Sequence, residues 1–411
     1  HAIQARIYAE NPLRQFQPSA GLLSEVVWPQ ARSDNGLRID TWVETGVEVS
    51  SFFDPMLAKV IVRADDRAQA INKLDDALAE TRLYGVASNL EYNRALLQDP
   101  VFGAGQMYTA YLSGFAFRPP AIEVLMPGTL STIQDLNGRP DLWEVGVPPS
   151  GAFDGLSFML GNRLIGNDDD CAGLEITING PSLRFHVAAQ VVVAGADIGI
   201  DLDGESQAMW TVISIAAGQT LALGSIPKIG ARAYLLIRGG LQCPEYLGSR
   251  ATFTLGQFGG HAGRALRMGD VLKICPLVRT LPPLSLPIEQ RPKICNRWEL
   301  HVTYGPHGAP DFFTQNDIER LFDSEWEVHF NSSRTGIRLI GPKPEWARET
   351  GGEAGMHPSN IHDNAYAFGT VDFTGDMPVI LGPDGPSLGG FVCPATVISA
   401  DLWKLGQLRA G

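Results

Sequence analysis

The stretch Met56-Leu57-Ala58-Lys59-Val60-Ile61-Val62 decides the fold class of the first part of this chain. Its apolar residues follow one another almost without interruption, which is typical of a strand buried on both faces. Asp65 or Asp66 can then cap a helix that ends by Gly85. The apolar residues of this helix recur at helical spacing and are Ile71, Leu74 and Leu78. A strand that leads directly into a helix indicates a mixed α and β unit.

The sequence on both sides of this stretch extends the mixed unit to residues 1–118. Apolar and polar residues alternate in residues 3–7, as in a half-buried strand. A second helix is expected after Ser88 or Asn89, either of which can cap it. A double proline stops any regular element, so we place a linker at residues 119–121.

Residues 122–411 have a different pattern. Short apolar runs, such as residues 234–237, alternate with clusters of glycine, proline, asparagine and aspartate. Many short strands between turn signals are typical of a β-barrel or a β-sandwich. A proline-rich run at 281–287 divides this region into two lobes, at about 122–280 and 295–411. The predicted fold class is therefore α+β, with a small mixed domain followed by a mostly β domain of two lobes.

Length and charge exclude several classes of protein. The 411 residues are too many for one ordinary core, and 45 acidic against 32 basic residues give a formal charge of −13. This negative charge argues against a nucleic-acid groove and against binding to an anionic membrane surface. No apolar stretch approaches the roughly 20 residues of a membrane span. The five cysteines show no CxxC spacing, which favours free thiols in a cytoplasmic protein over disulfides or zinc.

Searches for catalytic motifs are negative. The sequence contains no GxxxxGK[ST] loop, no HExxH and no GxSxG, and its eight histidines are dispersed, so no metal site is indicated. The chain begins at His1 and runs directly into a strand, so we expect it to be a piece of a longer polypeptide. From the residues alone, it is a multidomain protein that binds a small polar ligand.

Four stretches in residues 1–117 carry a first family resemblance. They are HAIQARIYAENP (1–12), FQPSAG (16–21), FDPMLAKVI (53–61) and GVASN (85–89). In order and spacing they match the C-terminal domain of biotin carboxylases, which this part of the chain therefore resembles.

About ten short stretches in residues 122–411 carry a second resemblance, to the allophanate hydrolase subunit 2 family and its KipA-type relatives. They include PPSGAFD (148–154), LEIT (174–177), GSR (248–250), RTGIRL (334–339) and GG (389–390). The resemblance implies a cyclophilin-like β fold in two lobes.

The two blocks in one chain resemble the urea carboxylase family. This resemblance implies an enzyme that uses ATP, Mg and bicarbonate to carboxylate biotin, and then transfers the carboxyl group to urea to give allophanate. ATP and Mg would bind mainly outside this fragment. No Met-Lys-Met site for biotin is present, so a biotinyl carrier domain and a partner β domain are expected elsewhere. The fragment alone is expected to be inactive, and a homodimer is considered by analogy with biotin carboxylases.

Two alternatives stay open at this point. A guanidine carboxylase would share the architecture and differ in the charge of the substrate pocket. A KipA-like binding or regulatory module would have no catalytic activity, although such a module would have no use for a biotin carboxylase tail.

The resemblance implies a catalytic and cofactor-binding role for Arg38, next to the biotin ring and bicarbonate. A guanidinium there would stabilise the negative charge that develops on the ureido oxygen of biotin. The alternative is a surface arginine paired with Asp40 or Glu44. The resemblance implies a cofactor-binding role for Asp54 too, because the matching stretch lies near the carboxylation site in the family, although an aspartate before Pro55 is also typical of a turn.

The most polar run of the second block is HPSNIHDNAY, at 357–366. The predicted substrate-binding residues are Asn364, Asp363, His362, Tyr366 and Ser387. Urea is a small neutral molecule, and an unpaired buried polar group costs ~1–3 kcal/mol. Asn364 offers a donor and an acceptor without net charge, which favours urea, whereas a carboxylate would favour guanidinium. The alternative is a solvated loop with an Asx turn. His362 or Asp363 could accept a substrate proton, although biotin-dependent transfer does not require a protein base.

Overall fold

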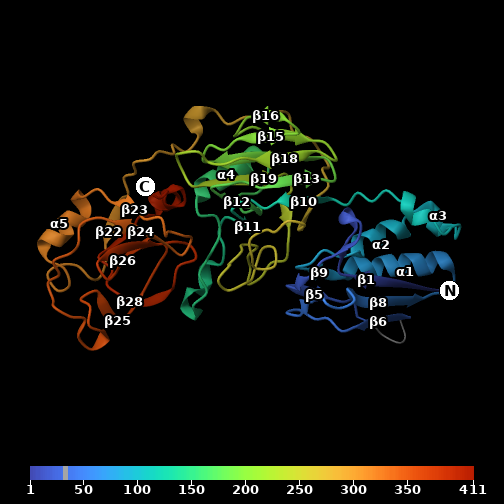
Figure 1. Cartoon of the computed structure of the whole chain (residues 1–411), viewed down its shortest axis with the longest axis horizontal. Coiled ribbons are helices and arrows are strands. Elements are labelled where there is room, and N and C mark those ends of the chain that lie inside the picture. The colour runs from blue at the N-terminus through green and yellow to red at the C-terminus, as the bar shows by residue number, and fades with distance from the viewer. Residues whose placement is uncertain (31–35) are drawn as a thin grey trace.

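The computed structural model describes residues 1–30 and 36–411. Figure 1 shows three bodies in a row along the longest axis of the molecule. The first unit contains the N-terminus, lobe A (residues 121–274) lies in the middle, and lobe B (residues 302–411) contains the C-terminus. The mixed first unit and the mostly β remainder confirm the predicted α+β fold class.

The first unit is built on a three-stranded antiparallel sheet in the order β1-β8-β6, with α1 and α2 packed on one face. Its strands are β1 (Ala2–Tyr8), β2 (Glu10–Asn11), β3 (Gln17–Pro18), β4 (Gly21–Leu22), β5 (Glu25–Val27), β6 (Leu37–Thr41), β7 (Glu48–Val49), β8 (Met56–Arg63) and β9 (Arg82–Tyr84). Its helices are α1 (Arg67–Glu80), α2 (Leu90–Leu97) and α3 (Pro100–Gly103).

Local sequence signals explain this unit well. The side chain of Asp66 caps α1 by accepting a hydrogen bond from the backbone of Gln69, as its position before the helix predicts. Ile71, Leu74 and Leu78 are buried against the sheet. The buried strand expected at 56–62 is β8, which pairs with β1 on one side and β6 on the other.

Lobe A consists of two stacked antiparallel sheets. The seven-stranded sheet has the order β16-β15-β18-β13-β10-β21-β20, and the five-stranded sheet has the order β11-β12-β19-β14-β17. The elements are β10 (Ala121–Met126), β11 (Leu130–Gln134), α4 (Gly155–Leu164), β12 (Gly173–Thr177), β13 (Ser182–Phe185), β14 (Ala189–Gly195), β15 (Ile200–Leu202), β16 (Glu205–Gln207), β17 (Ile213–Ile215), β18 (Thr220–Leu223), β19 (Arg232–Ile237), β20 (Leu241–Gln242) and β21 (Val271–Ile274).

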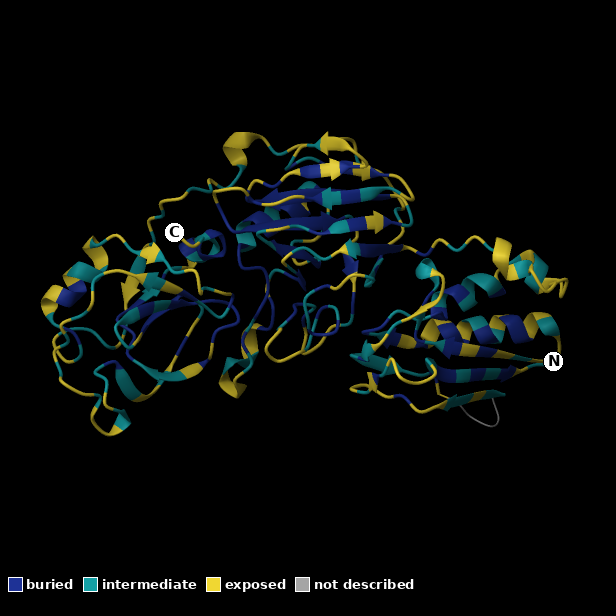
Figure 2. Cartoon of the chain, viewed as in Figure 1, coloured by how far each residue is buried: buried dark blue, intermediate teal, exposed yellow. Residues whose placement is uncertain are grey.

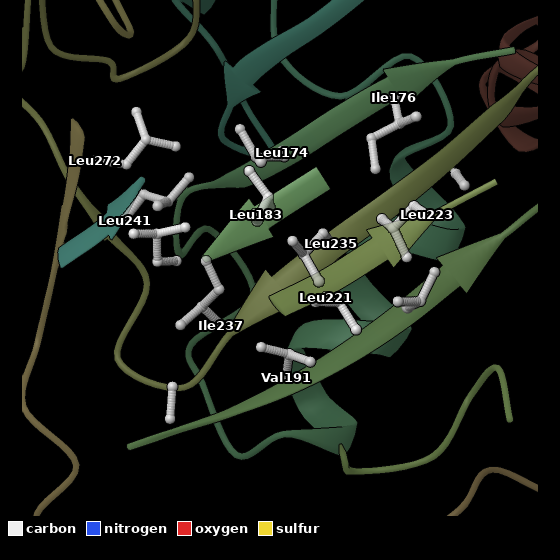
Figure 3. Packing of buried hydrophobic residues seen from close by; sticks show 14 of the residues in the cluster. Leu174, Ile176, Leu183, Val191, Leu221, Leu223, Leu235, Ile237, Leu241 and Leu272 are labelled. Atoms are coloured by element: carbon white, nitrogen blue, oxygen red, sulfur yellow. The ribbon is translucent and has the colours of Figure 1, made fainter. Parts of the chain in front are cut away.

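The largest hydrophobic cluster of the described residues fills the space between these sheets. Figure 3 shows Leu183 and Leu221 of one sheet packed against Leu235 and Ile237 of the other. Successive residues of a strand point to opposite faces, so Tyr234 and Leu236 face away from this core and pack against Phe158 of α4. Figure 2 shows that the strands of lobe A are mostly buried, whereas exposed residues are frequent in lobe B.

Lobe B contains a six-stranded antiparallel sheet in the order β22-β29-β26-β27-β24-β23, and a separate two-stranded ribbon, β25-β28. The elements are β22 (Val302–Tyr304), α5 (Gln315–Asp323), β23 (Glu327–Val328), β24 (Gly336–Ile340), β25 (Asn360–Ala365), β26 (Thr370–Thr374), β27 (Met377–Leu381), β28 (Leu388–Phe391) and β29 (Ala395–Val397). Thr314 and Asp317 form a reciprocal capping box at the start of α5.

Polar contacts join the first unit to lobe A. The guanidinium of Arg14 donates to the carboxylate of Glu123 at 2.6 Å, and Lys273 Nζ lies 3.1 Å from a carboxylate oxygen of Glu91. Both partners of the first pair are largely removed from solvent, since the side chains are 26% and 4% exposed. These ion pairs fix the first unit beside β10 and β21.

Candidate functional site

The β25-β28 ribbon of lobe B brings three of the predicted substrate residues together. Asn364 of β25 lies directly opposite Gly389 of β28, so no side chain faces Asn364 across the ribbon. One residue further along the chain from β25, the backbone N–H of Tyr366 donates to the carbonyl of Ser387 at 2.8 Å. Asn364 at the end of β25, Tyr366 just after it and Ser387 just before β28 therefore lie around one end of the ribbon.

Tyr366 fixes the geometry of this end. Its hydroxyl accepts a hydrogen bond from the backbone N–H of Phe391 at 2.8 Å and donates to the carbonyl of the same residue at 2.9 Å. Burial raises the pKa of this hydroxyl, so it is protonated at neutral pH. A side chain at Gly389 would collide with the ring of Tyr366. The side chain of Tyr366 therefore holds the backbone at this end of the ribbon in place.

The polar side chains of β25 differ in exposure. Asn364 is half-buried, and within the described part of the chain its side-chain amide has no hydrogen bond, so it is free to bind a ligand. His362 and Asp363 are exposed, and the imidazole of His362 lies 3.9 Å from the carboxylate of Glu353. The predicted alternative of a loop is wrong for residues 360–365, because these residues form β25.

A buried carboxyl that the sequence analysis missed lies on β26, beneath the ribbon. Asp372 is 3% exposed, and its Oδ1 atom has no hydrogen-bond partner among the described residues. Burial raises the pKa of this carboxyl to about 7. The signal in the sequence was an aspartate between the two apolar residues Val371 and Phe373.

A second missed feature anchors the segment that leads into β28. The guanidinium of Arg334 bridges the carboxylates of Asp384 and Glu175, and all three side chains are buried. Glu175 belongs to lobe A, whereas the other two belong to lobe B. Residues 174–177 and 334–339 both belong to stretches that match the family. The sequence around Glu175 and around Arg334 does not indicate that these two side chains form an ion pair.

The two predicted residues of the first unit lie elsewhere. Arg38 is on β6, its side chain is 73% exposed, and its guanidinium donates to both carboxylate oxygens of Asp40, at 2.8 and 3.0 Å. This is the surface ion pair that the sequence analysis gave as the alternative for Arg38. Asp54 accepts a hydrogen bond from the backbone N–H of Met56, as a turn former does. Phe52 and Phe53 beside it are 90% and 80% exposed.

The structure thus separates the candidate residues into two groups. β6 and β25 lie toward opposite ends of the longest axis, with lobe A between them (Figure 1). A single small ligand cannot contact both groups in this arrangement.

Neither a cavity nor a metal-binding cluster coincides with the predicted substrate residues in the described part of the chain. A cavity of about 780 Å³ lies beside the inner face of the lobe B sheet and is lined by Val302, Val371 and Ile380, but not by the predicted substrate residues. In residues 1–30 and 36–411, no group of histidine, cysteine, aspartate and glutamate is arranged to hold a metal ion. Among the same residues, no helix has the length and apolar character needed to cross a membrane.

Comparisons with known proteins identify both parts of the chain. The model of the carboxyltransferase domain, subdomain A and B, matches residues 145–411, and that of the biotin carboxylase C-terminal domain matches residues 4–114. Urea amidolyase of Saccharomyces cerevisiae is 46% identical over 417 residues, which cover 100% of this chain and 22% of that protein. This chain therefore spans less than a quarter of that curated relative.

Two further relatives support the same division. The crystal structure of Kluyveromyces lactis urea carboxylase superposes with a TM-score of 0.94 at 47% identity, covering 100% of this chain and 37% of that one. A 5-oxoprolinase component of Haemophilus influenzae is 31% identical over 293 residues, which cover 71% of this chain and 88% of that protein. The 293 matched residues are too few to include the first unit together with lobes A and B.

Proposed function

Because this chain belongs to the carboxyltransferase family with subdomains A and B, and carries a biotin carboxylase C-terminal domain before them, we propose that it serves a biotin-dependent enzyme that carboxylates urea to allophanate. The observation that carries the proposal is the presence of both domains in one chain that is 46% identical to a urea amidolyase along its whole length. ATP and Mg binding, the biotinyl carrier domain and a partner β domain would come from polypeptide other than these residues.

Arg38 suits the first half of this reaction. Its exposed guanidinium uses Nε and Nη2 for Asp40, which leaves Nη1 for an anionic or polar ligand such as bicarbonate or the ureido group of biotin. The hydrogen bonds that Arg38 donates to the carboxylate of Asp40 hold the pKa of Arg38 above its usual value, so the positive charge is permanent. Biotin, when bound, carries the carboxyl group on a ring nitrogen. Asp54 would support the same site by holding the turn at Phe53.

Asn364 suits the second half. Urea presents N–H donors and one carbonyl acceptor, and the free amide of Asn364 can pair with both kinds of group. The absence of a side chain at Gly389 leaves room for a small ligand beside it. Ser387 and Tyr366 would form the base of the site, while His362 and Asp363 would stand at its solvent side. The exposed carboxylate of Asp363 would instead suit guanidinium.

A chimera tests this proposal directly. The segment of S. cerevisiae urea amidolyase that aligns with this chain is replaced by residues 1–411, and bicarbonate-dependent ATP hydrolysis is measured with urea and with guanidinium. Free biotin as the acceptor reports on the first half-reaction alone and shows whether the chimera is assembled. We expect urea to stimulate turnover and Asn364→Asp to shift the preference toward guanidinium, while Asn331→Asp, at an exposed turn, changes nothing.

Each other outcome has a definite meaning. An assembled chimera that guanidinium stimulates and urea does not would assign the chain to guanidine carboxylation. An assembled chimera that carboxylates free biotin but responds to neither compound would remove the carboxyltransferase claim. In that case, a non-catalytic binding module becomes the better description of lobes A and B.

A further inference from the structure

Four charged side chains meet at the junction of the two lobes, and we call them the junction cluster: Glu175, Arg232, Arg334 and Asp384. Each of the four is at most 6% exposed. Glu175 lies on β12 and Arg232 on β19 of lobe A, whereas Arg334 precedes β24 and Asp384 follows β27 in lobe B. The cluster therefore joins four segments that are distant in the sequence.

Arg334 is the centre of the cluster. Its Nε and Nη2 atoms donate to the two oxygens of Asp384 at 2.8 and 3.1 Å, and its Nη1 atom donates to Glu175 Oε1 at 2.7 Å. Nη2 also donates to the carbonyl of Gly151 in lobe A at 2.8 Å. A planar guanidinium can satisfy all these acceptors at once, whereas a lysine ammonium cannot. Arg334 thus fixes Asp384 at a defined distance from lobe A.

The charges of the cluster balance each other. Burial alone would lower the pKa of Arg334, but the carboxylates of Asp384 and Glu175 outweigh burial and raise it. Burial alone would raise the pKa of Glu175, but Arg334 and Arg232 outweigh burial and lower it. Arg334 and Glu175 are therefore both held in their charged forms.

The chain around Asp384 leads directly to the candidate substrate site. Asp384 lies three residues before Ser387, and its backbone N–H donates to the carbonyl of Arg334. The carbonyl of Pro383 accepts a hydrogen bond from Ser150 of lobe A at 2.9 Å. A side chain at Gly382 would collide with the backbone of Arg334, so the two segments are as close as a glycine allows. Beyond Ser387 the chain enters β28, which faces Asn364.

Stability is a poor explanation for so many buried charges. The desolvation of a buried ion pair often cancels its attraction, and apolar side chains of similar volume are then equally or more stabilising. Charged groups instead fix the relative orientation of the segments that carry them, because each hydrogen-bond donor must align with its acceptor. The segment from Pro383 to Ser387 is held in this way on two sides.

We propose that Arg334 is a positioning residue for carboxyl transfer: through Asp384 on one side and Glu175 on the other, it holds the 383–391 segment at a fixed place relative to lobe A and so sets the position of the substrate site. This inference rests on the proposed function, because the site it positions is the one proposed for urea. Removing the Arg334–Asp384 pair should then impair transfer to urea without impairing carboxylation of biotin.

The test uses the chimeric holoenzyme described above. Arg334→Met alone leaves a buried carboxylate unpaired, so we expect a lower melting temperature. In the double variant Arg334→Met/Asp384→Leu both charges are gone, and Glu175 keeps the guanidinium of Arg232 at 3.4 Å, so the melting temperature should recover. The urea-dependent kcat of this double variant should nevertheless be about 10–100-fold lower, as for a displaced reacting group. Arg338→Met, on the exposed face of β24, is the matched control.

The outcomes separate positioning from mere stability. A double variant with recovered melting temperature and urea-dependent kcat within twofold of the parent would overturn the proposal. If the double variant does not fold, Arg334→Lys in the 411-residue chain gives the second measurement, by amide hydrogen exchange. Faster exchange at Tyr366 and Phe391 supports the anchoring, and unchanged exchange refutes it. A parent chimera without urea turnover defeats the proposed function, whereas the exchange measurement reports on the anchoring alone.

Discussion

Replacing Asp372 with asparagine is expected to stabilise the protein at neutral and alkaline pH. The carboxyl is 3% exposed, one of its oxygens has no hydrogen-bond partner among the described residues, and no cation pairs with it there. Ionising such a group in the folded state is unfavourable, because burial removes the water that would solvate the negative charge. Asparagine has the shape of the neutral acid and cannot ionise.

The magnitude follows from the two pKa values. The pKa of Asp372 rises from an ordinary 3.8 to about 7 on folding, because of burial. Below pH 4 both states are protonated, and the aspartate costs nothing. Between pH 4 and 7 only the unfolded state ionises, so the free energy of unfolding falls by about 1.4 kcal/mol per pH unit. Above pH 7 both states are ionised, and the loss stays constant at up to about 4 kcal/mol.

Urea-induced unfolding of the 411-residue chain and of Asp372→Asn between pH 4 and 8 measures this effect. The two free energies of unfolding should converge near pH 4 and separate toward pH 7, with the variant more stable above it. Asp311→Asn, at an exposed position of lobe B, controls for the loss of one negative charge from a chain of net charge −13. A difference between variant and parent that does not change with pH would refute the reasoning.

Three further predictions concern the β25-β28 ribbon and the contact between the first unit and lobe A. Gly389→Ala should displace the ring of Tyr366 and destabilise lobe B by about 1–3 kcal/mol, measured by thermal unfolding. Tyr366→Phe removes both hydrogen bonds to Phe391 and should cost about 1–3 kcal/mol, with faster amide exchange at Phe391. Glu123→Gln weakens the ion pair with Arg14, so small-angle X-ray scattering should show a wider distribution of the overall dimensions of the molecule. A distribution equal to that of the parent would contradict the role of this ion pair in fixing the first unit to lobe A.

The sequence predicted the elements of the first unit because their signals are local. The spacing of Ile71, Leu74 and Leu78 and the cap at Asp66 lie within fourteen residues, and helix α1 follows from them. Strand-rich lobes were predicted from short apolar runs, but their pairing order depends on contacts between distant strands.

The candidate site was predicted less completely, for a physical reason. Asn364 and Tyr366 were predicted because they belong to a polar run, and the structure brings them together with Ser387 at one end of the ribbon. Arg334 and Glu175 were missed as a pair because 159 residues separate them in the sequence. A charge inside a short stretch does not reveal its burial or its partner, since both are set by how the two lobes pack.

The separation of the two candidate groups has a consequence for the proposed reaction. Arg38 belongs to the first unit and Asn364 to lobe B, and lobe A lies between them (Figure 1). Arg14–Glu123 and the junction cluster hold these three bodies together through ion pairs with defined geometry, so the two groups do not approach each other by a small adjustment. Under the proposed function, the carboxyl group must therefore travel between them on a mobile carrier.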